Sequence, residues 1–167
     1  ELINNGHTIK LNYQKGSSIT IEGKTFNLLQ VHFHSLSEHK INGEHFPLEA
    51  HFVHSDSNGN LAVIGALFEE TRYNRTLKKL WDYIPIKLNQ VNTLPDLINI
   101  EKLLPKDRSY FRYNGSLTTP PCSEGVAWFV LKDKIHFSSR QLDTFTSVFD
   151  HHINRPVQPI NARLILQ

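Results

Sequence analysis

Two histidines lie one residue apart in residues 28–39, LLQVHFHSLSEH, and a third lies in a second segment, PLEAHFVH. Both segments read as strands. Because side chains alternate across a strand, His32 and His34 share one face, with Cα atoms about 7 Å apart. If the second strand pairs with the first, His51 supplies a third nitrogen. Three neutral imidazoles with an open fourth position form the ligand set of a catalytic zinc site.

Two polar residues accompany these histidines at matching positions. Gln30 lies two residues before His32, and Glu49 lies two residues before His51, each on the same strand face as its histidine. A metal-bound histidine usually donates its other ring N–H to a fixed acceptor. We therefore expect Gln30 and Glu49 to accept these hydrogen bonds and to orient two of the ligands.

Apolar residues are expected on both faces of these strands. Alternation places Leu28 on the face of the first two histidines, and places Leu29, Val31 and Phe33 on the opposite face. Val53 shares the face of the third histidine. This distribution favours a cavity over the alternative of a polar, solvated sheet face.

A different metal chemistry also fits part of this pattern. The stretch HFHSLSE matches H-x-H-x3-E, the first metal motif of cupins, in which His32, His34 and Glu38 would bind iron or manganese. The second cupin motif requires a proline-and-glycine turn before its histidine, and PLEAHFVH contains none. Glu38 is a ligand only under this alternative.

The remaining sequence predicts the elements that position these residues. A chain of 167 residues fits one domain, 1–167, and its net charge of +2 without basic runs argues against a nucleic-acid partner. No run approaches the roughly 18 apolar residues of a membrane span. A hairpin around Gly23, a turn at SDSNGN, helices at 75–84 and 138–149, and strands at 125–131 and 161–167 are expected. The fold predicted is mainly β (α+β), with a large twisted, mostly antiparallel central sheet and a few peripheral helices.

Several motifs together resemble the α-class carbonic anhydrases, bacterial members in particular. In the family's order, they are NNGH, LQVHFHS, SEH, PLEAHFVH, LAVIGALF, YNGSLTTPPCSEGVAWFVL and NRPVQPINAR. The resemblance implies the α-carbonic-anhydrase fold and a zinc lyase, a carbonate dehydratase. Such an enzyme converts carbon dioxide and water reversibly to bicarbonate and a proton by attack of zinc-bound hydroxide, and it binds sulfonamide and anion inhibitors.

The resemblance assigns the metal site. His32, His34 and His51 match the three Zn²⁺ ligands, with Gln30 and Glu49 as their hydrogen-bond acceptors. Neutral ligands leave the ion its positive charge, and zinc then lowers the pKa of bound water to about 7, for which carbonic anhydrases are themselves the standard example.

The resemblance also assigns residues around the metal. Thr118 matches the threonine that accepts a hydrogen bond from the hydroxide, and Glu38 matches the acid that accepts a hydrogen bond from that threonine. Thr119 matches a residue that binds bicarbonate and anions. His7 matches the proton shuttle, for which an unperturbed pKa near 6.5 is suited. The wall that holds carbon dioxide is matched by Val53, Val63, Leu117, Val126 and Trp128.

One cysteine and the start of the sequence depart from the family pattern. The family's domain begins several tens of residues earlier, so its N-terminal part is expected to be absent from this sequence. Cys122 matches a cysteine that in secreted members pairs with one in that early segment, which implies a disulfide and a periplasmic or secreted protein. Many bacterial members are dimers, so a homodimer is an open alternative. A binding module without catalysis typically lacks ligand histidines, and all three are present here.

Overall fold

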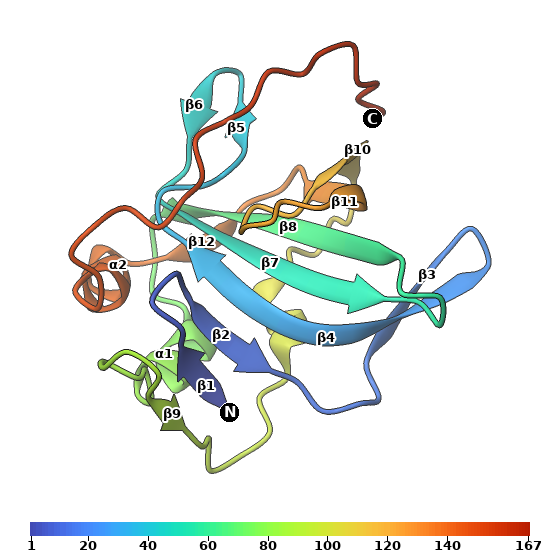
Figure 1. Ribbon diagram of the computed structural model, residues 1–167. Helices are drawn as coiled ribbons and strands as arrows, with labels where there is room; N and C mark the ends of the chain where they lie inside the picture. Colours follow the sequence, from blue (N-terminus) through green and yellow to red (C-terminus); the bar gives the residue numbers. More distant parts are fainter.

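A computed structural model describes residues 1–167 and contains a large twisted sheet of ten strands (Figure 1). The order along the main path is β10-β11-β8-β7-β4-β2-β1-β9, while β3 pairs with β4 and β12 with β8. The strands of this sheet are β1 (Leu2–Asn4), β2 (Ile9–Asn12), β3 (Ser18–Ile21), β4 (Lys24–His34), β7 (Leu48–Ser55), β8 (Leu61–Glu70), β9 (Val91–Asn92), β10 (Tyr110–Ser116), β11 (Glu124–Leu131) and β12 (Ile135–Phe137). A separate hairpin joins β5 (Lys40–Ile41) to β6 (Glu44–His45).

Most neighbouring strands are antiparallel, as the sequence predicts. The exceptions are β11 and β12, which both run parallel to β8. A parallel pair requires a long crossover connection. The chain between β8 and β11 provides one, because it contains α1 (Arg75–Trp81), the 3₁₀ helix η1 (Ile100–Leu103) and two further strands.

Two tight turns set the register of the central strands. In the β3–β4 hairpin, Ile21 pairs with Lys24, and the two intervening residues Glu22 and Gly23 have φ angles of 50° and 78°. Positive φ at both positions is the geometry of a two-residue hairpin turn. Between β7 and β8, the Asp56 carboxylate accepts hydrogen bonds from the backbone N–H groups of Asn58 and Asn60. Both predicted turns are confirmed.

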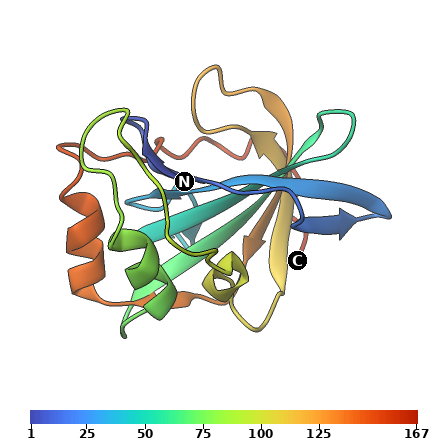
Figure 2. The same ribbon diagram turned by 90° about the horizontal axis from the view of Figure 1, so that it is seen from below.

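The main hydrophobic core lies between one face of the sheet and the helices, which Figure 2 shows on the same side of the molecule. Helix α2 spans Ser139–Thr146. Trp81 of α1 stacks on Phe145 of α2 at 5.2 Å between ring centroids, and Phe33 of β4 meets Trp81 edge-on at 4.9 Å. Burying side chains of this size contributes about 1.5–3 kcal/mol each to stability, so the packing of the helices stabilises this face of the sheet. The sheet's other face is left for the polar residues of β4 and β7.

Polar residues fix where the helices begin. Asn74 caps α1, since its side chain accepts from the N–H groups of Thr76 and Leu77. Gln141 in the first turn of α2 accepts from the backbone N–H of Ser138, which is half of the predicted capping box. The same side-chain amide donates to the backbone oxygen of Asn74, joining the two helix starts. Neither α-helix has the length and apolar character needed to span a bilayer.

The predicted faces of Leu28 and Leu29 are wrong because β4 contains a bulge. Leu28 pairs with His54 and Gln30 with the next residue, Val53, so Leu29 is one residue too many. An extra residue reverses the alternation on one side of the bulge. Leu28 is consequently buried in the main core, while Leu29 is 47% exposed.

Three other boundaries differ from the prediction. Helix α1 ends at Trp81 and does not reach residue 84, and helix α2 ends at Thr146 and does not reach residue 149. The segment 161–167 forms no strand and makes only a single bridge, between Leu166 and Arg112 of β10. Asn161 and Ala162 have positive φ angles of 49° and 59°, which turns the chain at the point where the strand was expected. Leu164 is 79% exposed, so its side chain contributes no burial that would extend the pairing.

Candidate metal centre

The pairing of β4 with β7 brings the three predicted histidines together. His32 lies directly opposite His51, and His34 follows on the same face of β4. His51 Nδ1 is 3.2 Å from His32 Nε2, and one nitrogen from each of the three rings lies within 4.8 Å of the other two. His34 and His51 are both 1% exposed, whereas His32 is half-buried. The cluster therefore has one side open toward solvent.

The second nitrogen of each ring has a partner that fixes the tautomer. A carbonyl or carboxylate oxygen can only accept, so the ring nitrogen beside it must carry the proton. The three pairs are His32 Nδ1 with Gln30 Oε1 at 2.8 Å, His34 Nδ1 with the backbone oxygen of Ile153 at 2.8 Å, and His51 Nε2 with Glu49 Oε1 at 2.9 Å. The three remaining nitrogens, which face one another, therefore all present lone pairs.

Three converging lone pairs are suited to a cation. His51 Nδ1 and His32 Nε2 lie 3.2 Å apart, but neither carries a proton, so they form no hydrogen bond with each other. His34 Nε2 is buried and has no hydrogen-bond partner in the protein. Two ligands of a tetrahedral zinc ion lie about 3.3 Å apart when each Zn–N bond is 2.0–2.1 Å. Burial and the neighbouring rings lower the pKa values of His32 and His34, which keeps both rings neutral. The residues present thus fit a zinc ion.

Glu49 is fully buried and accepts four hydrogen bonds. Its Oε1 accepts from His51 Nε2 at 2.9 Å and from His39 Nδ1 at 2.6 Å, and its Oε2 accepts from the backbone N–H groups of Glu38 and His39. Burial alone would raise the pKa of Glu49, but His39 and His51 outweigh it and hold that pKa well below its usual range. The carboxylate therefore remains charged and is fully engaged in orienting its neighbours.

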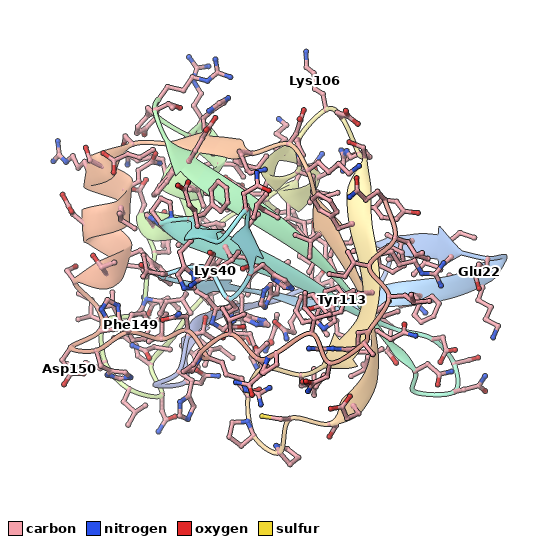
Figure 3. The ribbon with its side chains drawn as sticks, turned by 90° about the horizontal axis from the view of Figure 1, so that it is seen from above. Glu22, Lys40, Lys106, Tyr113, Phe149 and Asp150 are labelled. Carbon is pink, nitrogen blue, oxygen red and sulfur yellow. The ribbon has the colours of Figure 1, made fainter.

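His39 and Tyr113 extend this network, and the sequence analysis missed both. His39 Nε2 lies 2.7 Å from the phenol oxygen of Tyr113, which Figure 3 labels. Burial alone would lower the pKa of His39, but the Glu49 carboxylate reverses this and raises it. His39, Glu49 and His51 could by themselves form a second group of metal ligands. Their facing atoms are already joined by hydrogen bonds, so this group acts as support for His51.

Gly65 is a further residue that the sequence analysis missed. It lies on β8 directly opposite His51. A Cβ atom at this position would stand 2.9 Å from Glu49 Oε1, closer than real Cβ contacts allow. A lone glycine inside the apolar strand LAVIGALF is a signal of close approach by another group. Here the approaching group is the Glu49 carboxylate.

Glu38 and Thr118 both line a cavity of about 360 Å³, in which the one lining histidine is His39. Glu38 Oε1 accepts from the backbone N–H of Arg155 at 2.6 Å, and Glu38 Oε2 is buried without a partner. No hydrogen bond joins the Thr118 hydroxyl to Glu38 in this structure. The predicted bond between them stays a prediction, for which the unpartnered Oε2 has an acceptor site available.

The expected apolar wall forms one cluster beside the histidines. Its buried members are Val53, Val63, Val126 and Trp128, and Leu117 packs against them. The ring of Trp128 lies 4.8 Å from the ring of His51, and its Nε1 donates to the backbone oxygen of Ser116. The structure thus brings together all five residues named from the sequence.

His7, Thr119 and Cys122 lie at the periphery. His7 is exposed in the turn between β1 and β2, where its backbone N–H donates to the Asn5 side chain at 3.0 Å. Thr119 is exposed next to Thr118. Cys122 is the only cysteine of the sequence and its thiol is free, so no disulfide can form within these residues.

Known proteins resemble the chain over its whole length. A family model described as eukaryotic-type carbonic anhydrase matches residues 1–167. A carbonic anhydrase of Pectobacterium carotovorum is 44% identical over 166 residues, covering 99% of this chain and 68% of that protein. One of Neisseria gonorrhoeae is 45% identical over 165 residues, covering 98% of this chain and 65% of that protein. Among solved structures, the α-carbonic anhydrase from Thermovibrio ammonificans in complex with sulfanilamide has a TM-score of 0.97 and 48% identity, covering 100% of this chain and 74% of that one. The chain spans about two thirds of the length of these curated relatives.

Proposed function

The chain belongs to the eukaryotic-type carbonic anhydrase family and is an enzyme of that family, and we propose that it hydrates carbon dioxide reversibly at His32, His34 and His51. The products are bicarbonate and a proton. The observation that carries the proposal is the convergence of three imidazole lone pairs within 4.8 Å of one another, beside an apolar cluster. Such a site offers a metal position and a surface for an apolar substrate next to it.

His32 Nε2, His34 Nε2 and His51 Nδ1 are the atoms proposed to hold the metal. When bound, a zinc ion on three neutral nitrogens supplies a nucleophile at neutral pH by lowering the pKa of water, a chemistry of which carbonic anhydrases are the standard example. Gln30, the backbone oxygen of Ile153 and Glu49 hold the three rings in the tautomer that this requires.

The apolar cluster is proposed to hold carbon dioxide. The substrate has no charge and no hydrogen to donate, so Val53, Val63, Val126, Leu117 and the face of Trp128 can bind it by contact alone. The same side chains exclude competing water from that side of the site. Weak binding of this kind lets the substrate lie against the nucleophile without stabilising it in an unreactive position.

Thr118 and Glu38 are proposed to orient the attacking water. If the Thr118 hydroxyl donates its proton to the unpartnered Oε2 of Glu38, its lone pairs are left to accept from that water. This directs the water's own lone pair toward the carbon dioxide, which is catalysis by positioning. Thr119, at the exposed side of Thr118, is proposed to contact bicarbonate.

His7 is proposed to carry the product proton to buffer. It is exposed at the turn between β1 and β2, and β2 pairs with the strand of His32. An imidazole in water exchanges protons readily near neutral pH. Sulfonamides are proposed to bind at the open metal position, as the sulfanilamide complex of the Thermovibrio ammonificans enzyme supports.

We also propose that the protein works in the periplasm or outside the cell and that Cys122 forms a disulfide there. The support is the match of Cys122 to a cysteine that is paired in secreted relatives. Because this sequence has one cysteine, the partner would lie outside these 167 residues. Mass spectrometry without reduction, on protein from its own host, tests the disulfide. A homodimer is proposed from family resemblance alone, and light scattering tests it.

Stopped-flow measurement of carbon dioxide hydration tests the proposed reaction. The zinc-loaded chain is compared with chain stripped by a chelator, with chain reloaded with zinc, and with chain treated with sulfanilamide. We expect activity to vanish on stripping, to return on reloading, and to be abolished by sulfanilamide. His51→Ala should be inactive, while the matched control His136→Ala, at a half-buried histidine of β12, should be active. Stoichiometric zinc without hydration would contradict the proposed reaction, and a preference for iron or manganese would contradict the proposed metal.

A further inference from the structure

Lys10 lies on the same face of the sheet as the metal centre. It pairs directly with His32 across β2 and β4. Residues directly opposite in an antiparallel pair have Cβ atoms about 4.5–5.5 Å apart, on the same face. Its strand neighbours Ile9 and Leu11 are 0% and 2% exposed and belong to the main core, so alternation confirms that Lys10 faces the other way.

The positive charge of Lys10 has no partner in the chain. The residue is half-buried, and its ammonium forms neither an ion pair nor a hydrogen bond, unlike Lys78, which pairs with Asp82. Neither of the two acids of the site pairs with Lys10. Glu49 accepts from His39, His51 and two backbone N–H groups, and Glu38 Oε1 accepts from the backbone N–H of Arg155. A charge without a counter-ion in the protein remains able to attract an anion that binds nearby.

The proposed reaction forms such an anion in the same place. Bicarbonate arises from neutral carbon dioxide next to His32, and Thr119, the side chain proposed to contact it, carries no charge. We propose that Lys10 is an anion-binding residue of this site, whose ammonium attracts and holds bicarbonate and other monovalent anions at the metal position. This inference rests on the proposed function.

The strength of the effect follows from the separation and the exposure of the charges. If the Lys10 ammonium and the bound anion are about 7 Å apart, at an effective dielectric between that of water and that of a protein surface, their attraction changes anion affinity about three- to tenfold. No variant can change the ratio of kcat/KM for hydration to kcat/KM for dehydration, because the equilibrium constant of the reaction fixes that ratio. The affinity for an anion is therefore the quantity to measure. Salt should weaken the effect, since a half-exposed charge is screened.

Titration of the cobalt-substituted protein with thiocyanate, followed by its visible spectrum, tests the inference. Lys10→Gln should bind thiocyanate about three- to tenfold more weakly than wild type, with a smaller difference at high ionic strength. Lys10→Arg keeps the charge and should bind as wild type. The matched control Lys24→Gln, at an exposed lysine of β4, should also bind as wild type. Imidazole at pH 8 is a neutral probe, and its affinity should be the same in every variant.

Two results would overturn the inference while the proposed function stands. One is unchanged thiocyanate affinity in Lys10→Gln. The other is an equal loss of thiocyanate and imidazole affinity, which would indicate a structural role. If the wild-type chain neither binds cobalt nor hydrates carbon dioxide when loaded with zinc, the proposed function fails and the inference fails with it.

Discussion

Replacing Glu49 with glutamine tests how His51 is kept in its metal-binding tautomer. The change keeps the shape of the side chain but turns one oxygen into an NH₂ group. All four groups around Glu49 are donors, namely His39 Nδ1, His51 Nε2 and two backbone N–H groups. If the amide oxygen stays with the backbone, the NH₂ group faces the two rings, and His51 Nε2 must either face another donor or give up its proton. In the second case the proton moves to Nδ1, the atom proposed to bind zinc.

The magnitude follows from that conflict of donors. Leaving a buried donor unsatisfied costs about 1–3 kcal/mol, which corresponds to a loss of roughly 5- to 150-fold in zinc affinity. Mutations of residues that support metal ligands typically weaken metal binding by about 10- to 100-fold, a range to which carbonic anhydrases themselves contribute.

Competition with a chelating dye measures zinc affinity directly, and circular dichroism checks the fold. The matched control is Glu70→Gln, at an exposed glutamate at the end of β8, which should bind zinc as wild type. A folded Glu49→Gln protein with zinc affinity within about threefold of wild type would refute the assigned tautomer, because the conflict would then cost less than the range for a buried donor.

Four other predictions concern the same face of the sheet and the core beneath it. His51→Ala should lose zinc and hydration together, measured by metal analysis and stopped flow, and a variant retaining both would remove His51 from the ligand set. Gly65→Ala should destabilise the protein by about 1–3 kcal/mol in urea unfolding, because its Cβ would stand 2.9 Å from Glu49 Oε1; an unchanged midpoint would contradict that close contact. Burial lowers the pKa of His54 in the folded protein, so the unfolded chain takes up the proton first as pH falls. The contribution of His54 to stability should therefore be full above about pH 6.5 and decline as pH falls from there toward the folded pKa. In thermal unfolding, His54→Leu should lose less stability between pH 7 and 5 than wild type. Equal losses of stability would count against a neutral buried His54. His7→Ala should slow turnover in dilute buffer, and small imidazole buffers should restore it; turnover independent of buffer would exclude His7 as the shuttle.

The ligand histidines were predictable because their geometry is local. Alternation places His32 and His34 on one face of β4. His51 joins them only because β4 pairs with β7, a pairing that was a condition of the prediction. Gln30 and Glu49 followed from the same alternation, and the structure places both within hydrogen-bonding distance of their histidines. The apolar wall was identified through family resemblance, since its members come from three strands and a loop that are distant in sequence.

What the sequence did not reveal depends on tertiary packing. The third acceptor is the backbone oxygen of Ile153, 119 residues from His34, and a backbone oxygen carries no sequence signal. Tyr113 and His39 are in hydrogen-bonding contact although they are far apart in sequence. The spacing of neither residue from the ligand histidines indicates this contact. The bulge at Leu29 reversed two side chains, because alternation assumes an unbroken ladder. The segment 161–167 has an apolar composition suited to a strand but only one partner residue, Arg112.

X-ray absorption at the zinc edge, on the zinc-loaded chain, tests the proposed centre most directly. If His32, His34 and His51 hold the ion, the spectrum will show four light-atom neighbours at about 2.0–2.1 Å, three of them with the outer-shell scattering of imidazole rings. The fourth neighbour should be replaced when sulfanilamide is added. Two imidazoles with a carboxylate ligand, or six-fold coordination, would contradict the assignment of these three histidines and the open position that carbon dioxide hydration requires.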